Sequence, residues 1–182
     1  MKEYPIATVF GGTGFVGRQV VRELAVAGYR VKVATRVPER AYFLRPCGNV
    51  GQVVPFACDY SDHSIIAAVQ GADVVVNCIG ILYERGKRST FQRAHIDIPS
   101  SIAQACQSEG VARFVHVSAL SSQLSVSVQG SKYARSKTAG EEAVLDGCSN
   151  AVILRPSVIF GEDDQFFNMF ARMVQLLSLI HI

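Results

Sequence analysis

The sequence has no apolar run long enough to cross a membrane. Its richest apolar stretch, DVVVNCIGIL, has about half the length of a membrane span and is interrupted by Asn77 and Gly80. The beginning, MKEYPIATVF, has neither the layout of a signal peptide nor an Arg/Ser-rich transit stretch. If this beginning is native, we expect a cytoplasmic protein without a membrane span, and the alternative is a mature organellar protein.

Paired cysteines and metal-ligand spacings are also missing. The five cysteines are far apart and form no CxxC pair, which argues against a disulfide framework and a structural zinc site. Basic residues are scattered, and the densest cluster, ERGKR at 84–88, is typical of a solvated loop rather than of a nucleic-acid surface. We expect no metal and no nucleic-acid partner. With 49% hydrophobic and 18% charged residues, the chain is long enough for one globular domain.

Short β-rich runs alternate with helical stretches along the chain. Strands are predicted at 6–10, 30–35, 52–57, 73–77, 113–118 and 151–155, and helices at 15–27, 62–69, 98–109 and 131–146. Repeated strand–helix–strand units require right-handed crossovers and a parallel sheet covered on both faces. The predicted fold class is α/β, a doubly wound parallel Rossmann sheet with strand order 3-2-1-4-5-6. We assign 1–161 to this nucleotide-binding domain and 162–182 to the start of a C-terminal lobe that is largely missing, as in a fragment.

A glycine-rich stretch follows the first predicted strand and opens the first helix. FGGTGFVGR satisfies both G-x-x-G-x-x-G and G-x-G-x-x-G. An early glycine permits a tight turn, the next lets backbone amides approach a pyrophosphate, and the last lets the helix pack on the strand. The helix amino terminus then offers unpaired N–H groups to the phosphates. The alternative is a purely structural glycine turn. The predicted dinucleotide-binding residues of this loop are Gly11, Gly12, Thr13, Gly14, Phe15, Val16 and Gly17.

Arg36 stands where NAD-binding domains carry an acid that bonds the ribose 2′-hydroxyl. The stretch reads VATRVPER, and a guanidinium at this place can pair with a 2′-phosphate, with Arg18 and Arg40 as helpers. The alternative is that Arg36 is a solvated surface residue. The sequence thus predicts NADP(H) as the preferred cofactor, with NAD(H) as the alternative.

Tyr133 and Lys137 are four residues apart in SKYARSK and therefore share one face of a helix. An ammonium near a phenol lowers the phenol pKa below its usual value of about 10. Beside a nicotinamide ring, Tyr133 would exchange a proton with a substrate oxygen while hydride moves to or from the ring. The alternatives are a chance spacing and a grip on the nucleotide without turnover.

Together these segments resemble the short-chain dehydrogenase/reductase superfamily, of the extended or atypical kind that includes NAD-dependent epimerases and dehydratases. The segments that carry the resemblance are GGTGFVG (11–17), CDYSD (58–62), NCIG (77–80), HVSALS (116–121), YARSK (133–137) and LRPSVIFG (154–161). Within this group the chain is most similar to the NAD(P)-binding accessory subunit of respiratory complex I, of the alpha-subcomplex subunit nine type. The stretches FVHVSALS, YARSKTAGEEAV and LRPSVIFGEDDQFFNMF carry that closer similarity.

The resemblance also implies which residues contact the adenosine half of the cofactor. Asp59 corresponds to the acid after the third strand that contacts the adenine amino group. Ile79 and Gly80 correspond to the loop that passes the adenine ribose.

At the nicotinamide half, the resemblance implies that Ser118, Tyr133 and Lys137 form the catalytic set. Ser118 would donate a hydrogen bond to the substrate oxygen, and Lys137 would also bond the nicotinamide ribose. Pro156 corresponds to the segment that touches the nicotinamide end. His95 falls near the position where the superfamily often has an asparagine, and this departure calls the proton relay into question.

Three functions follow from these patterns. The first, which we predict, is an NADP-binding protein of the complex I accessory-subunit type, with a structural nucleotide. Its partners would be respiratory complex I or other quinone-linked membrane proteins. The second is a free-standing NADP-dependent oxidoreductase or nucleotide-sugar epimerase/dehydratase that uses Tyr133 and Lys137. The third is a redox sensor that binds NADP without chemistry.

Overall fold

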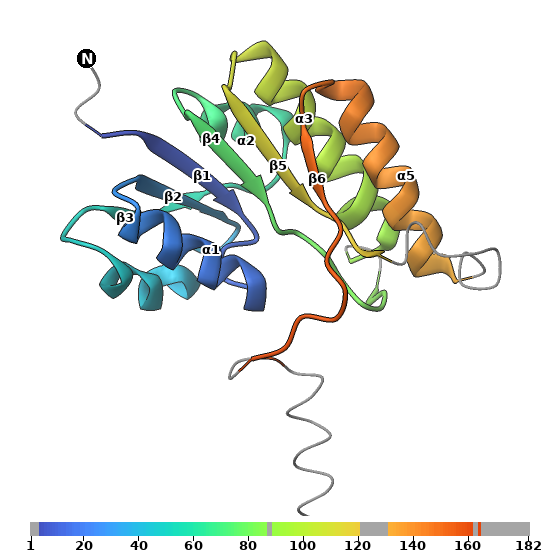
Figure 1. The fold of residues 1–182 in the computed structure, drawn as a ribbon, viewed down its shortest axis with the longest axis horizontal. Helices are drawn as coiled ribbons and strands as arrows, with labels where there is room; N and C mark the ends of the chain where they lie inside the picture. Colours follow the sequence, from blue (N-terminus) through green and yellow to red (C-terminus); the bar gives the residue numbers. More distant parts are fainter. Residues whose placement is uncertain (1–3, 87–88, 121–130, 162–163, 165–182) are drawn as a thin grey trace, which may run out of the picture.

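The computed structural model describes residues 4–86, 89–120, 131–161 and 164. The strands are β1 (Ile6–Phe10), β2 (Arg30–Thr35), β3 (Val53–Ala57), β4 (Val74–Asn77), β5 (Arg113–Val117) and β6 (Val152–Leu154). The α-helices are α1 (Phe15–Val26), α2 (Asp62–Val69), α3 (Ile98–Ser108) and α5 (Lys132–Gly147). A 3-10 helix, η1 (Pro38–Cys47), fills the insertion after β2, and a π-helix, η2 (Gln92–Asp97), runs directly into α3. Figure 1 shows their arrangement.

The six strands form one sheet in the order β3-β2-β1-β4-β5-β6, and every neighbouring pair is parallel. This confirms the predicted fold class and strand order. Because all strands point the same way, the loops after β1, β2, β4 and β5 meet at the side of the sheet where the strands have their carboxyl ends. This side is called the carboxyl edge below. The predicted site residues therefore gather at that edge.

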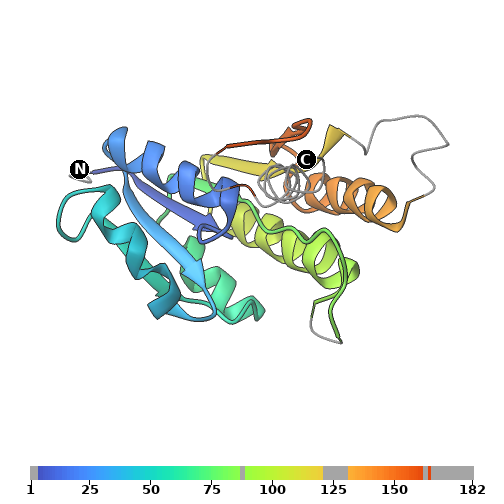
Figure 2. The same ribbon diagram turned by 90° about the horizontal axis from the view of Figure 1, so that it is seen from below.

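Helices cover both faces of the sheet. On one face, residues of α2, α3 and α5 pack with Phe10, Val75 and Phe114. On the other, residues of α1 and η1 pack with Val9 and Val33. Figure 2 shows α1 and α3 on opposite sides of the sheet. The valines of β4 contribute to both cores, as an unbroken apolar strand in a parallel sheet should.

Pro55 lies within β3, a position that weakens a strand prediction. The strand forms because β3 is at the edge of the sheet. The Gln52 carbonyl accepts from Val31 N–H, and Cys58 N–H donates to the Thr35 carbonyl. The backbone N–H and C=O groups of the even-numbered residues therefore point toward β2. Pro55 has an odd number, so its backbone nitrogen points away from β2. Its missing N–H therefore removes no hydrogen bond between β2 and β3.

Most of the predicted C-terminal segment, 162–182, lies outside the described residues, as does 121–130 before α5. The division of the chain at Gly161 therefore stays a prediction.

Candidate functional site

The glycine loop lies at the carboxyl end of β1, beside the end of β4. Gly11 has φ of +73°, and a Cβ there would be 2.8 Å from the carbonyl carbon of Cys78. A Cβ on Gly17 would overlap with the carbonyl oxygen of Gly11. A Cβ on Gly12 would be 2.9 Å from a methyl of Val33. The loop is thus compressed between two strands and its own helix, and only glycine fits there.

Gly14 is the N-cap of α1, and it donates to the Gly11 carbonyl over 3.0 Å. No side chain caps this helix, and its first turn contains no acid. The positive end of the α1 dipole is therefore not neutralised by the helix itself. An uncapped, glycine-lined helix amino terminus is suited to a phosphate anion. Thr13, Phe15 and Val16 lie half-buried around it.

Arg36 follows β2 directly and is exposed at the same edge of the sheet. Its guanidinium lies over the ring of Tyr60, 5.7 Å from the centroid. Tyr60 has φ of +67°, a rare conformation for a residue with a side chain. The sequence patterns did not single out Tyr60. The structure thus adds an aromatic support beneath the arginine that was predicted to read the 2′-phosphate.

Asp59 is exposed next to Tyr60 and is held in place by its neighbours. Its Oδ1 accepts from Ser61 N–H at 2.9 Å, from Ser61 Oγ at 2.7 Å and from Ser64 Oγ at 2.7 Å. These hydrogen bonds, that from Ser64 first, hold the pKa of Asp59 well below its ordinary value. Asp59 is therefore a fixed anion at neutral pH, suited to accept from an amino group.

Arg18 joins α1 to η1. Its Nη2 donates to the Thr13 carbonyl at 3.5 Å, and its guanidinium lies over Phe43, 5.4 Å from the centroid. Arg40, the other proposed helper of Arg36, is exposed on η1. No contact of Arg18 or Arg40 with Arg36 is among those described, so their role as helpers of Arg36 stays a prediction.

Ser118, Lys137 and Pro156 come together at the carboxyl ends of β5 and β6. Lys137 Nζ donates to the Val117 carbonyl at 2.9 Å, one residue before Ser118. Leu120 N–H donates to the Pro156 carbonyl at 2.9 Å. Ser118 is buried, and its Oγ has no hydrogen-bond partner among the described residues. A buried hydroxyl with unused capacity is suited to bond a ligand.

His95 is fully buried in η2 and connects two parts of the site. Its Nε2 accepts from Ile81 N–H at 3.1 Å, in the loop that contains Ile79 and Gly80. Nδ1 therefore carries the ring proton and donates to Ser136 Oγ at 2.8 Å, which in turn donates to the Tyr133 carbonyl at 2.7 Å. Burial lowers the pKa of His95 to about 4, so the ring is neutral. Both ring nitrogens are used in holding α5 to the loop.

The shape of η2 has a local cause. In an α-helix the His95 carbonyl would accept from the residue four positions later, but that residue is Pro99, which has no N–H. The carbonyl instead abuts Gly140 of α5, where a Cβ would overlap with it. Sequence reasoning used neither Pro99 nor Gly140 for the site. Pro99 is the sequence feature that indicates the departure of η2 from a regular helix. Gly140 is the one that indicates its close approach to α5.

The ring of Tyr133 is half-buried and contacts two other rings. His95 stacks on Phe91 with centroids 5.2 Å apart, and both rings meet Tyr133 edge-on, at 5.5 and 6.0 Å. Burial raises the pKa of the Tyr133 phenol above its ordinary value. The prediction that Lys137 lowers this pKa is therefore wrong in this structure. The physical reason is that burial dominates, while the Lys137 ammonium is bonded to the Val117 carbonyl.

Lys137 is a buried cation. Burial lowers its pKa to about 8, against the opposing effects of Glu141 and Cys78. The Cys78 thiol has its pKa raised to about 12 by burial, so it is a neutral neighbour and no nucleophile. Lys137 thus keeps its charge near neutral pH by a narrow margin.

Asn77 and His116 form a second buried pair below the site. Asn77 Oδ1 accepts from Ile79 N–H at 3.0 Å, so its Nδ2 donates to His116 Nδ1, also at 3.0 Å. Nε2 of His116 then carries the proton, and it has no partner among the described residues. Burial lowers the pKa of His116 to about 3, so this ring is also neutral. The pair fixes the loop that contains Ile79 and Gly80.

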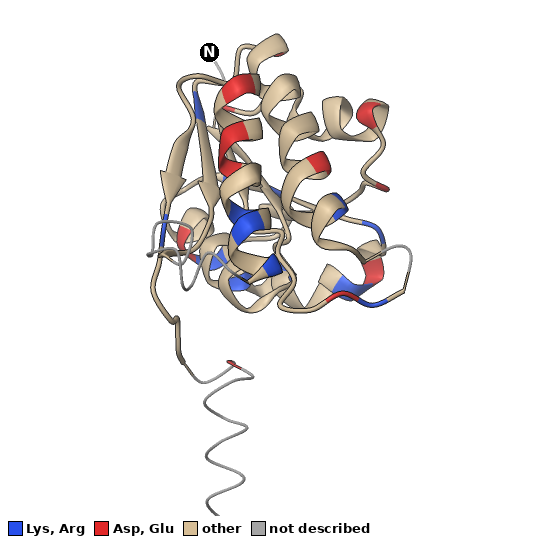
Figure 3. Cartoon of the chain, turned by 90° about the vertical axis from the view of Figure 1, so that its right-hand side faces the viewer, with Lys and Arg blue, Asp and Glu red and all other residues tan. Residues whose placement is uncertain are grey.

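Charge is ordered along α5. Its basic residues, Lys132, Arg135 and Lys137, precede its acidic ones, Glu141, Glu142 and Asp146. Figure 3 shows the basic turns toward the carboxyl edge of the sheet and the acidic turns away from it. Isolated helices favour the reverse order, because their amino termini are positive. The order in α5 places positive charge where an anionic ligand would lie.

No group of His, Cys, Asp or Glu in the described part of the chain is arranged to hold a metal. None of the helices described is long and apolar enough to cross a membrane.

The chain matches the model of the NAD dependent epimerase/dehydratase family over residues 7–178. It therefore belongs to this family. Among curated proteins, mouse NADH dehydrogenase [ubiquinone] 1 alpha subcomplex subunit 9, mitochondrial, is 42% identical over 168 residues, which are 91% of this chain and 44% of that protein. The Arabidopsis thaliana protein of the same name is 38% identical over 181 residues. These relatives confirm the resemblance inferred from the motifs.

Another relative is a ceramide reductase of Caulobacter vibrioides, 33% identical over 87% of this chain and 48% of that protein. The chain thus spans about half the length of the curated relatives it matches. Among solved structures, UDP-N-acetylglucosamine 4-epimerase from Bacillus cereus has a TM-score of 0.69 at 20% identity, over 92% of this chain and 66% of that one. Vestitone reductase from alfalfa has a TM-score of 0.65 at 25% identity, over 82% and 56%. The epimerase supports the fold alone.

Proposed function

We propose that this chain holds a nicotinamide dinucleotide, NADP(H) in preference to NAD(H), as a structural component. The pyrophosphate would lie on the uncapped amino terminus of α1, against the glycine loop. The 2′-phosphate would pair with Arg36, whose guanidinium is supported by Tyr60. Asp59 would bond the adenine amino group, and Lys137 the nicotinamide ribose. Family membership supports the choice of a nicotinamide dinucleotide over other anions.

The observation that carries the structural role is the environment of Tyr133. A proton donor needs a pKa near the working pH, and burial moves the pKa of this phenol upward, away from neutrality. Edge-on contacts with Phe91 and His95 restrict the Tyr133 ring, and His95 uses both of its nitrogens in local bonds. His95 is thus tied to the fold rather than available for a proton relay. These features support a nucleotide that is held without turnover.

In this proposal the full-length protein acts as the alpha subcomplex subunit 9 proteins do by name, as a part of an NADH dehydrogenase [ubiquinone] assembly. Its partners are the respiratory complex or another quinone-linked membrane protein. The protein would lie peripherally at the inner membrane, on the cytoplasmic side in a bacterium or on the matrix side in an organelle.

The deciding experiment purifies the protein without added nucleotide and identifies what it releases on denaturation. Exchange of bound NADPH against labelled NADPH is then timed. We expect stoichiometric NADP(H) with exchange over hours. Exchange within seconds would contradict a structural nucleotide, and an empty protein that does not take up NADP(H) would contradict the whole proposal.

A second candidate function is an NADP-dependent oxidoreductase. It is favoured by the relative named a ceramide reductase and by the presence of Ser118, Tyr133 and Lys137 together. Fast exchange, together with oxidation of NADPH by a carbonyl substrate that is lost in Tyr133→Phe, would favour it. A nucleotide-sugar epimerase would favour NAD(H), and a redox sensor would bind NADPH and NADP⁺ with sharply different affinities.

A further inference from the structure

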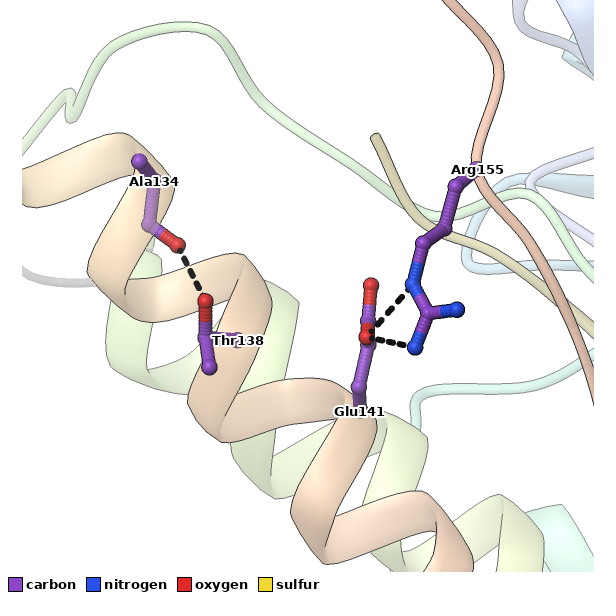
Figure 4. Close-up of polar contacts among 4 residues, drawn as sticks. All are labelled: Ala134, Thr138, Glu141 and Arg155. Atoms are coloured by element: carbon purple, nitrogen blue, oxygen red, sulfur yellow. Dashed lines mark hydrogen bonds and ion pairs between the residues drawn. The ribbon is translucent and has the colours of Figure 1, made fainter. Parts of the chain in front are cut away.

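A buried carboxylate lies one helical turn beyond Lys137. Glu141 is 6% exposed, and its Oε2 accepts from Nε and Nη2 of Arg155 at 2.9 and 2.7 Å. Figure 4 shows the two side chains meeting between α5 and the chain after β6. A carboxylate buried to this degree requires a partner, and Arg155 supplies one.

Arg155 is well placed to link Glu141 to the site. It directly precedes Pro156, whose carbonyl accepts from Leu120 N–H, and it follows Leu154, whose carbonyl accepts from Ser118 N–H at 2.7 Å. The ion pair thus fastens α5 to the segment that was predicted to touch the nicotinamide end.

The titratable groups around Lys137 come from every element packed against it. Tyr133 and Glu141 lie on α5, Cys78 follows β4, His95 belongs to η2 and His116 to β5. The two histidines are neutral, and the phenol and the thiol keep their protons. Glu141 is therefore the one anion among these groups, and its partner Arg155 is a further cation beside it. A buried ammonium without an opposite charge loses its proton.

We propose that Glu141, oriented by Arg155, is the positioning residue that keeps Lys137 protonated and directed at the nucleotide at neutral pH. This inference rests on the proposed function, in which Lys137 grips the nicotinamide ribose. It assigns the ion pair a role in the site beyond fastening α5 to β6. The lowered pKa of Lys137, about 8, makes the effect measurable, because the ammonium has little margin to lose.

The test compares Glu141→Gln with Glu142→Gln, a matched control on the exposed side of the same helix. The first readout is the titration midpoint of Lys137, followed by NMR of its ε-carbon without nucleotide. We expect Glu141→Gln to lower this midpoint by about one pH unit and Glu142→Gln to leave it unchanged. An unchanged midpoint in folded Glu141→Gln would show that the ion pair is only a fastener, and the inference would be overturned.

The second readout is the release rate of bound NADPH between pH 6 and pH 9. In the wild type, release should accelerate as the pH rises through the Lys137 midpoint, and in Glu141→Gln the same acceleration should occur at lower pH. A shifted midpoint with an unchanged release profile would overturn the link to the nucleotide. A wild-type protein that binds no NADP(H) defeats the proposed function instead, while the first readout still decides whether Glu141 keeps Lys137 charged.

Glu141→Gln leaves the exposed Arg155 guanidinium without its carboxylate partner, and this unpaired cation would itself lower the Lys137 midpoint. If this variant does not fold, the double variant Glu141→Gln, Arg155→Met replaces both charges with neutral side chains of similar length. It removes the anion beside Lys137 without leaving an unpaired charge. Because the Arg155 cation is removed as well, a smaller fall in the Lys137 midpoint is expected than in Glu141→Gln, and an unchanged midpoint overturns the inference in the same way.

Discussion

The two halves of the candidate site are built from different materials. The adenosine half consists of backbone, in the glycine loop and the amino terminus of α1, and of exposed side chains such as Arg36 and Asp59. The proposed nicotinamide half consists of buried side chains, of which His95 and Lys137 are held by hydrogen bonds to neighbouring elements and Ser118 Oγ has no partner among the described residues. The first half depends on glycines, where a Cβ would overlap with neighbouring backbone, and the second depends on the hydrogen bonds of buried side chains such as His95 and Lys137.

This difference predicts how each half fails. A backbone loop tolerates substitutions of the side chains around it. It does not tolerate an added Cβ on a glycine that touches another chain segment. A buried polar network loses stability with each missing partner, and its neutral histidines make it sensitive to acid. Four experiments test this contrast, from the largest expected effect to the smallest.

Gly17→Ala should have the largest effect, because the new methyl group overlaps with the Gly11 carbonyl oxygen. We expect a loss of about 3 kcal/mol in the free energy of unfolding, together with loss of nucleotide binding although Lys137 is intact. Denaturant unfolding measures the first and nucleotide content the second. Gly161→Ala is the control, since its Cβ would be 3.5 Å from the ring of Phe15, an ordinary contact. Equal stability of the two variants would contradict the account of the loop.

His95→Gln should remove part of the acid sensitivity of the nicotinamide half. The unfolded chain takes up a proton on this residue near pH 6.5, whereas the folded ring does so only near its pKa of about 4. Stability from this ring is thus complete above pH 6.5 and falls as the pH drops to 4, by about 3 kcal/mol in total.

The variant should show a shallower decline, by about 1.4 kcal/mol per pH unit between pH 6 and pH 4.5. Denaturant unfolding at several pH values measures it. His63→Gln, at an exposed position of α2, should keep the wild-type slope. Parallel profiles for wild type and His95→Gln would refute the neutral, buried histidine.

Arg36→Asp should leave the fold intact and change only the choice of nucleotide. The new carboxylate repels a 2′-phosphate and can accept from a ribose 2′-hydroxyl, so the ratio of NADPH to NADH affinity should fall about tenfold or more. Competition binding measures this ratio. Arg22→Asp, an equal charge change at an exposed position of α1, should leave it unaltered. A ratio that stays the same in Arg36→Asp would remove Arg36 from the site.

Lys132→Glu should have the smallest effect, and it should be stabilising. This residue is exposed in the first turn of α5, where the helix dipole favours an acid. We expect the free energy of unfolding to rise by about 0.5 kcal/mol at low salt. The gain should disappear at high salt, because salt screens the interaction between the new carboxylate and the helix dipole. Lys132→Gln should give about half of this gain. A loss of stability would mean that Lys132 stabilises the fold, and it would contradict the view that its charge is placed there for an anionic ligand.

The sequence was sufficient for the elements that have a local pattern. Alternating strands and helices predicted the sheet, and the spacing of glycines located the loop after β1. The contacts of His95 lie 14 and 41 residues away in the chain, and those of Glu141 lie 14 residues away, so no spacing rule reports them. The expected effect of Lys137 on Tyr133 failed for a related reason. A helix face shows which residues are neighbours, but not how deeply the rest of the fold buries them.

The position of Pro55 has a consequence for how the sheet can be extended. An added strand needs a row of N–H donors along the edge it joins, and Pro55 interrupts that row on the outer side of β3. The opposite edge strand, β6, contains no proline. An added strand would therefore pair more readily with β6 than with β3, where the missing N–H of Pro55 opposes pairing.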